Sequence, residues 1–501
     1  MRLLIKYALA ASLVAIMAWP KTSAQYINTY YHMFGIPQAN QLNPSFQPGC
    51  NGYFGLPFIS SFRFQFVSNS ITLGDIFQWD SGLDQNNIFL HPDADREKFL
   101  DALRKSNRIR TEIGASILSL GWRSENLFFT LDFTERIMEE TSFPEDIMEL
   151  LIYGNLHQSN FNFSDLAQDI SYFHQLAIGL SYNSDDDLQI GIRAKLLLGG
   201  TNTTTKNSLM SIKTSIEEWK FNSDVLVNTS IPYLERPPVD NDGYLDLDSL
   251  ANSDFDLIFG LPDSPEDLLS PSGLKTIGGL KNPGFAVDLG FNYFPIEKLS
   301  VSASVVDLGF IRWKNYVWNF HQEIDYTFKG IEVKLEDDDT PQEDKESNFF
   351  EFSIGDELLD SIKNITKIKV TQDPYTTMLA GKIYLGVAYN LTEKVRFGGV
   401  FRTRIYNNNF YNQFTVSANV QPISMFSASL SYSIYGNSYS NLGLGMSLRL
   451  GPLNVYFITD QAPSAYFWPE NFTALNFRFG VNVVWGCRAI PKAMKDRPLI
   501  D

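Results

Sequence analysis

Residues 475–485 read LNFRFGVNVVW, and every second residue from Leu475 to Trp485 is large and apolar. The residues between them are mostly small or polar, including Arg478 and Gly480. Successive side chains of a β-strand point to opposite faces, so this period of two predicts a strand with one apolar and one polar face. Residues 283–293 and 426–434 repeat the pattern.

These runs are about 10 residues long, which is the length that a tilted strand needs to cross a bilayer. Strands of soluble proteins are usually only ~5–6 residues long. A large soluble β-protein is the alternative, but about a dozen such segments along one chain fit it poorly. Because only a closed barrel crosses a membrane as strands without unpaired backbone groups, the pattern predicts an all-β, antiparallel transmembrane barrel.

The connections between the segments alternate in length, and this predicts the topology. Short polar turns at one end and long loops at the other are typical of outer-membrane barrels. We expect fourteen strands, starting near residues 53, 111, 127, 171, 188, 283, 299, 376, 395, 409, 425, 440, 453 and 475. The stretch 205–230 is either a further hairpin of the wall, which would make sixteen strands, or a strand pair above the membrane.

The first residues predict export. Arg2 and Lys6 precede an apolar run, 7–18, and small residues 22–24 allow cleavage before Gln25, which is the layout of a secretory signal peptide. Its removal takes away three positive charges and changes the net charge from −17 to −20. Such an acidic chain is a poor match for nucleic acid, which is bound largely through Lys and Arg.

We therefore expect a simple division of the chain. It comprises a signal peptide (1–24), an N-terminal plug or arm (25–52), a barrel (53–487) with insertions at 68–110, 138–170, 201–282 and 314–375, and a periplasmic tail (488–501). Short helices are expected in the long extracellular loops, for example over 92–106 and after a capping box at Ser142. Val305-Val306 breaks the alternation, as a β-bulge would.

Four segments resemble a domain-of-unknown-function family of outer-membrane barrels from Bacteroidota that is related to the long-chain fatty-acid transporter FadL. They are QLNPSFQPG (41–49), FPEDIMELLIYGN (143–155), LAIGLSYNSDDDLQIGIRAKLLLGG (176–200) and NPGFAVDLGFNYFPIEKLSVSASVVDLGFIRWK (282–314). The resemblance covers nearly the whole mature chain. It implies a FadL-like barrel of fourteen strands in the outer membrane, and it implies no particular substrate.

The segment 25–52 contains no Asp, Glu, Lys or Arg and is rich in aromatic residues. Disordered tails are usually charged and poor in aromatics, so this segment is expected to be ordered against something. In FadL-like proteins the N-terminal stretch folds into the lumen as a plug, and we expect the same here; a periplasmic arm that docks on a partner is the alternative. The plug would pack through Tyr26, Tyr30, Tyr31, Phe34 and Phe46.

The two cysteines lie at the predicted seam of the barrel. In a closed barrel the first strand pairs with the last; Cys50 precedes the former and Cys487 follows the latter. Both would lie at the periplasmic rim, where the compartment permits a disulfide. We expect a Cys50–Cys487 bond, with two free thiols as the alternative.

Alternation places a set of charged residues on the inward face. Nine are basic: Arg63, Arg193, Lys195, Lys382, Arg396, Arg402, Arg404, Arg449 and Arg478; three are acidic: Asp132, Asp288 and Asp307. A cationic lumen would attract anionic ligands, whereas pairing of these charges inside a closed barrel is the structural alternative. Neither a nucleophile–histidine arrangement nor a complete metal-binding motif accompanies them, so the sequence predicts no enzyme, no cofactor and no metal.

The sequence predicts an outer-membrane barrel that binds or passes a small hydrophobic or amphipathic ligand. A cationic lumen would favour a ligand with an anionic group. The alternative is a non-transporting scaffold for envelope secretion or surface-attachment proteins. Membrane lipid is a partner in both cases.

Overall fold

The computed structural model describes residues 27–77, 89, 91, 94–155, 157–184, 187–232, 236–246, 249, 282–329, 367–407, 409–435, 441–461 and 473–487. The predicted signal peptide, Tyr26 and the tail 488–501 lie outside the described residues. Within them no helix has the length and apolarity that crossing a membrane would require.

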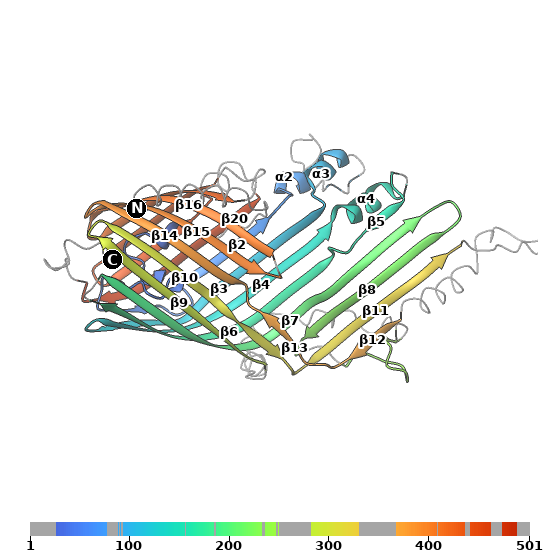
Figure 1. Ribbon diagram of the computed structural model, residues 1–501, viewed down its shortest axis with the longest axis horizontal. Helices are drawn as coiled ribbons and strands as arrows, with labels where there is room; N and C mark the ends of the chain where they lie inside the picture. Colours follow the sequence, from blue (N-terminus) through green and yellow to red (C-terminus); the bar gives the residue numbers. More distant parts are fainter. Residues whose placement is uncertain are drawn as a thin grey trace, which may run out of the picture.

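The chain folds into one antiparallel sheet with a few short helices (Figure 1). The strands are β1 Gly52–Gly55, β2 Phe62–Ser68, β3 Ser106–Ser124, β4 Leu127–Pro144, β5 Asn160–Asn162, β6 Ala167–Ser184, β7 Leu188–Thr214, β8 Trp219–Ser230, β9 Asn282–Ile296, β10 Leu299–Trp313, β11 Val317–Phe328, β12 Ile368–Thr371, β13 Tyr375–Met378, β14 Gly381–Thr392, β15 Val395–Tyr406, β16 Asn409–Ile423, β17 Phe426–Tyr435, β18 Leu442–Leu450, β19 Leu453–Thr459 and β20 Ala474–Trp485. The α-helices are α2 Leu73–Phe77, α3 Arg96–Ala102 and α4 Glu145–Tyr153, and two 3-10 helices cover Thr29–Tyr31 and Pro37–Gln41.

The sheet closes into a barrel of fourteen strands, as predicted. Around the ring, β1 and β2 together form the first strand, followed by β3, β4, β6, β7, β9, β10, β14 and β15 to β20 in order. The last strand, β20, pairs with β1 and β2 and closes the ring. Short turns such as Ser124–Leu127, Ile296–Leu299 and Leu450–Leu453 join neighbouring strands at one end, which we call the turn end; we call the opposite end the loop end.

The sixteen-strand alternative is wrong because the hairpin 205–230 lies beyond the barrel wall. β7 pairs with β9 from Leu188 to Gly199 and then with β8 from Asn202 to Thr214. β8 in turn pairs with β11, so these strands extend the sheet past the loop end, as Figure 1 shows on the right. α2, α3 and α4 lie above the same end and share a small apolar core around Phe99.

Two local predictions need correction. The first strand is interrupted, because Leu56–Ile59 form a hydrogen-bonded turn with Pro57, which has no N–H to donate to a strand ladder, at its second position. The turn points outward and leaves the Phe58 side chain 60% exposed. In addition, Ser142 does not cap α4: it belongs to β4, and its hydroxyl donates to the Asp165 carbonyl.

The predicted bulge in β10 is present, as a register shift between Val305 and Leu308.

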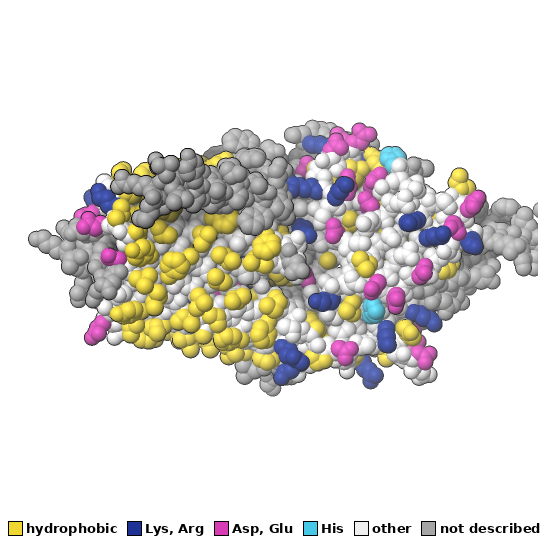
Figure 2. All heavy atoms as spheres, in the orientation of Figure 1, with side chains coloured by type: hydrophobic (Ala, Val, Ile, Leu, Met, Phe, Trp, Pro, Cys, Tyr) yellow, Lys and Arg dark blue, Asp and Glu magenta, His cyan; other side chains and the backbone are white. Residues whose placement is uncertain are grey.

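The outer face of the barrel carries many large apolar side chains, and in the view of Figure 2 they form an apolar surface over the turn-end part of the barrel. Large side chains that point outward are widely exposed, for example Ile178 at 61%, Leu289 at 48% and Leu430 at 49%. Exposed apolar patches of this extent mark an interaction surface, and a band around a barrel is the surface that faces lipid. Charged side chains gather instead on the extended part of the sheet in this view.

Candidate functional site: a plugged lumen and a groove in the wall

The segment from Ile27 to Asn51 folds inside the barrel, in its turn-end half. Tyr30, Tyr31, Phe34 and Phe46 are all buried there. Tyr30, Tyr31 and Phe46 form a core with wall residues such as Tyr384, which stacks on Tyr31 with ring centroids 5.6 Å apart. We call residues 27–51 the plug.

The plug is fixed to the wall by hydrogen bonds to strand backbone. The side-chain amide of Asn43 donates to the carbonyls of Phe291 and Ala303, at 3.2 and 3.4 Å. The Ser304 hydroxyl donates to the Leu42 carbonyl at 2.6 Å. These bonds satisfy backbone groups on both sides, and this is how an uncharged segment is held in a barrel.

Two glycines let the plug approach the wall this closely. Gly191 of β7 and Gly290 of β9 face inward, opposite each other in the ladder. A Cβ at Gly191 would lie 2.2 Å from the Pro44 carbonyl carbon, and a Cβ at Gly290 would lie 2.1 Å from the Asn43 side-chain oxygen. At this place only the strand backbone separates the plug from the outer face.

Two of the predicted lumen arginines are held by the plug. Arg396 lies over the Phe34 ring, 4.2 Å from its centroid, and donates to the His32 carbonyl at 3.3 Å. Arg478 lies over the Tyr30 ring at 4.7 Å and donates to the Tyr30 hydroxyl and the Gln41 side chain. An uncharged plug thus stabilises positive charge with π-faces and oxygen atoms.

On the loop-end side of the plug, charged side chains cluster around Asp307. Its carboxylate contacts Lys195 at 2.6 Å, Lys382 at 2.9 Å and Arg136 at 3.1 Å. We call this network the ionic layer, and its remaining contacts are Lys195–Asp288 (2.6 Å), Arg193–Asp132 (2.6 Å), Arg193–Asp288 (3.5 Å), Arg136–Glu112 (3.1 Å) and Arg63–Glu112 (2.8 Å). Since every basic group of this layer has a carboxylate partner, the lumen is less cationic than its inward arginines and lysines suggest.

Sequence analysis missed Arg136 and Glu112, although both are buried members of the ionic layer. Arg136 continues the inward alternation of Asp132 along β4, so extending the predicted strand would have found it. Glu112 is different, because a register shift between Ser116 and Leu118 of β3 changes the phase of its alternation.

Nearer the loop end, Arg402 and Arg404 are buried inside the barrel. Arg404 forms an ion pair with Glu140 at 2.9 Å, and Glu140 also accepts from the Tyr411 hydroxyl at 3.3 Å. Two small cavities lie in this part of the lumen, one of about 40 Å³ beside Asp307 and one of about 20 Å³ beside Arg404. Such volumes hold a few water molecules and no larger ligand.

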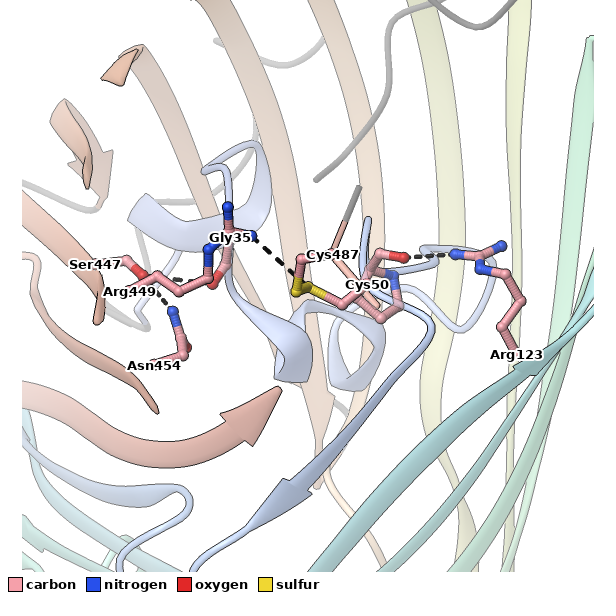
Figure 3. The surroundings of a disulfide bond; sticks show 8 residues. Gly35, Cys50, Arg123, Ser447, Arg449, Asn454 and Cys487 are labelled. Carbon is pink, nitrogen blue, oxygen red and sulfur yellow. Dashed lines mark hydrogen bonds between the residues drawn. A yellow bond between two sulfur atoms is a disulfide. The ribbon is translucent and has the colours of Figure 1, made fainter. Parts of the chain in front are cut away.

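The disulfide joins Cys50 and Cys487 at the turn end, across the seam between β1 and β20 (Figure 3). Arg449, which sequence analysis placed in the lumen, lies at this rim and is half-buried, with a guanidinium nitrogen 3.9 Å from the Cys50 sulfur. Arg123 on the other side donates to the Pro48 carbonyl at 2.5 Å. The end of the plug is therefore tied to the seam covalently and to β3 by a charge-assisted bond.

On the outer face of the barrel lies an apolar groove of about 480 Å³. Its walls include Ile190, Ile192, Leu289, Phe291 and Val305, and its floor is formed by Gly191, Gly290 and Ala303. We call it the wall groove. Its floor is the same stretch of backbone that the plug contacts from inside, at Asn43 and Pro44.

Within the described residues, no group of three or more His, Cys, Asp or Glu side chains is arranged to hold a metal ion. His174 bonds to Glu135 at 2.7 Å and His321 to Asp224 at 2.9 Å, while His32 belongs to the plug.

Several solved barrels are similar to this chain in structure. They include the toluene transporter TodX of Pseudomonas putida (9% identity, 93% of this chain and 98% of that one, TM-score 0.36), the toluene transporter TbuX of Ralstonia pickettii (8%, 92% and 98%, 0.39) and a FadL homologue of Pseudomonas aeruginosa (7%, 94% and 100%, 0.39). No curated protein matches the sequence.

The model of one protein family matches most of the chain, from residue 44 to residue 460. The matched region runs from the plug residue that contacts Gly191 to the end of β19, and so includes the wall groove and the ionic layer. The chain therefore belongs to the family of unknown function DUF5723.

Proposed function

We propose that this protein is an outer-membrane barrel that binds a small hydrophobic or amphipathic molecule in the wall groove and passes it inward when the plug shifts. The observation that carries the proposal is the wall groove itself: an apolar cavity of about 480 Å³ with a floor of glycine and alanine backbone. Pockets of ~300–1,000 Å³ lined by apolar side chains are typical of small-ligand sites.

The lipid-facing band and the difference between the turn end and the loop end support the membrane location. In this orientation the turn end faces the periplasm. The predicted signal peptide would deliver the chain there.

The plug and the small volumes of the cavities beside Asp307 and Arg404 support a barrel that is closed at rest. Since only backbone separates the wall groove from Asn43 and Pro44, a shift of the plug would open a path from the groove to the lumen. The plug also contacts two positive charges, Arg396 and Arg478, which suits an amphipathic ligand with an anionic group.

The filled lumen and its paired charges favour a second candidate, a barrel that scaffolds other envelope proteins. The extension formed by β8, β11 and β12 beyond the loop end gives such a scaffold a surface outside the membrane.

Native mass spectrometry of the protein, extracted gently from its own membrane, separates the two. The wild type should retain a small apolar molecule, and Ala303→Phe should lose it because the new ring fills the groove floor. Ala428→Phe on β17 is the matched control, since Ala428 is also a half-exposed alanine of the outer face. A bound protein instead of a small molecule would favour the scaffold, and retention of the molecule by Ala303→Phe would refute binding in the wall groove.

A further inference from the structure

A second cavity, of about 610 Å³, opens at the turn end of the barrel. It lies between the plug and the rim and is distinct from the wall groove; we call it the mouth pocket. Its apolar lining includes Pro37, Pro48, Ile423, Met425, Phe426 and Val484. Its size and lining fall in the range of sites for small organic ligands.

Arg449 is the charged group that enters the mouth pocket from the barrel wall. It faces inward at the end of β18, and its hydrogen-bond acceptor among the described residues is the Cys50 sulfur at 3.9 Å (Figure 3). Sulfur is a weak acceptor, and within the described part of the chain no carboxylate forms an ion pair with Arg449. Arg63, Arg193 and Arg404, by contrast, each have a carboxylate partner.

Among the described residues, the other charged side chains that line the pocket are Glu393 and Lys394. They are neighbours in one exposed turn, so their opposite charges largely cancel. Arg449 is half-buried, and a half-buried cation gains from a charge-assisted bond to an anion.

The walls of the mouth pocket are held in place before any ligand arrives. The disulfide fixes Cys50 to Cys487, and both residues line the pocket. On the opposite side, Ser427 donates to the Phe34 carbonyl at 2.8 Å and Ser447 to the Gly35 carbonyl at 3.4 Å. A preformed site lowers the conformational cost of binding.

We propose that the mouth pocket binds a small amphipathic anion, with its carboxylate or sulfonate on Arg449 and its apolar body against the proline, methionine and phenylalanine side chains. The anion fits because the pocket has an apolar lining and because Arg449 supplies one positive charge from the barrel wall. This site does not depend on the wall groove, and either can exist without the other.

The test uses the full chain in lipid nanodiscs, with 8,8,8-trifluorooctanoate as the probe and 8,8,8-trifluorooctanol as its neutral counterpart. Binding is followed by ¹⁹F NMR, with empty nanodiscs to subtract partition into lipid. The carboxylate should bind roughly 10-fold tighter than the alcohol, as one charge-assisted bond would give. Equal affinities for the two probes, or no binding of either, would overturn the proposal.

Variants then locate the site. Arg449→Gln should bring the two affinities together, and Arg449→Lys should keep most of the preference because it keeps the charge. Lys298→Gln, at another turn of the same rim, is the matched control and should change nothing. A preference that survives Arg449→Gln would place the anion elsewhere.

Two further variants separate the mouth pocket from the wall groove and from the C-terminal tail. Ala303→Phe should leave the preference for the carboxylate intact; if it abolished the preference while Arg449→Gln did not, the probe would be reporting on the wall groove and the proposal would fail. Binding that appears only after residues 488–501 are removed would mean that this tail is the occupant, which also overturns the proposal.

Discussion

The plug and the ionic layer fill the same barrel by opposite means. The plug is uncharged and holds the wall through amide and hydroxyl bonds to backbone and through ring faces on arginines. The ionic layer joins side chains of β2, β3, β4, β7, β9, β10 and β14 through four carboxylates, of which Asp307 contacts three basic groups, Asp288 and Glu112 two each, and Asp132 one. The plug is a separate segment that packs against the wall, whereas the ionic layer is formed by side chains of the wall itself.

This difference indicates which part can move. A neutral plug hydrogen bond contributes only ~0.5–1.5 kcal/mol net and one to a charged group ~1.5–3 kcal/mol, and a shifted plug can form new ones with water. Opening the ionic layer would leave buried charges without partners, which costs several kcal/mol. We therefore expect the ionic layer to stay fixed during function and the plug to be the part that shifts.

The largest effect should come from Asp307→Asn. Asp307 has a positive φ of 62°, and asparagine tolerates this conformation, so the change removes the charge with little backbone strain. Lys195, Lys382 and Arg136 would lose a shared partner, and we expect a loss of about 3–5 kcal/mol in the free energy of unfolding. The measurement is guanidinium-induced unfolding in detergent, followed by tryptophan fluorescence.

Asp325→Asn, an exposed carboxylate on β11, is its control and should change the free energy of unfolding by less than about 0.5 kcal/mol. Adding Lys382→Met to Asp307→Asn should recover part of the loss. A loss below about 1 kcal/mol for Asp307→Asn would contradict the fixed ionic layer.

The disulfide should come next. Changing Cys50 and Cys487 to serine releases the end of the plug from the seam, and we expect a loss of about 2–4 kcal/mol in the free energy of unfolding. Reductant should have a similar effect on the wild type and none on the double serine variant. Identical unfolding of the wild type with and without reductant would show that the seam does not need the bond.

Asn43→Ala should have a smaller effect that is confined to the plug. It removes the amide that bonds to the Phe291 and Ala303 carbonyls, so we expect a loss of about 1–3 kcal/mol and faster hydrogen exchange over residues 37–47. Exchange in β4 and β10 should stay slow. Asn162→Ala, at the exposed strand β5, serves as control; faster exchange throughout the barrel would mean that plug and ionic layer open together.

The smallest effect should come from Arg396→Lys. Lysine keeps the positive charge but loses the planar contact with the Phe34 ring, which contributes about 0.5–1 kcal/mol. Unfolding curves of Arg396→Lys and Arg396→Met would separate the ring contact from the charge. A loss for Arg396→Lys as large as that for Asp307→Asn would end the distinction between the two regions.

Much of the barrel was predictable because the alternation of side chains is a local property. The strand beginning at Val395 and the bulge after Val305 follow directly from it. Closure of the barrel also brings the first and last strands together, which is why two cysteines far apart in sequence were expected to meet. The break at Leu56–Ile59 was not predictable from alternation, since a proline turn replaces the ladder there.

The site was less predictable, because its contacts join distant strands. The sequence by itself determined which side chains face lipid and which face the lumen, since that depends only on position along a strand. The tertiary structure decided that Asp307 meets Lys195 and Lys382, that Gly191 and Gly290 face Pro44 and Asn43, and that Arg449 lies beside Cys50. These contacts depend on the register of neighbouring strands and on the path of the plug through the lumen, and neither is encoded in any one segment.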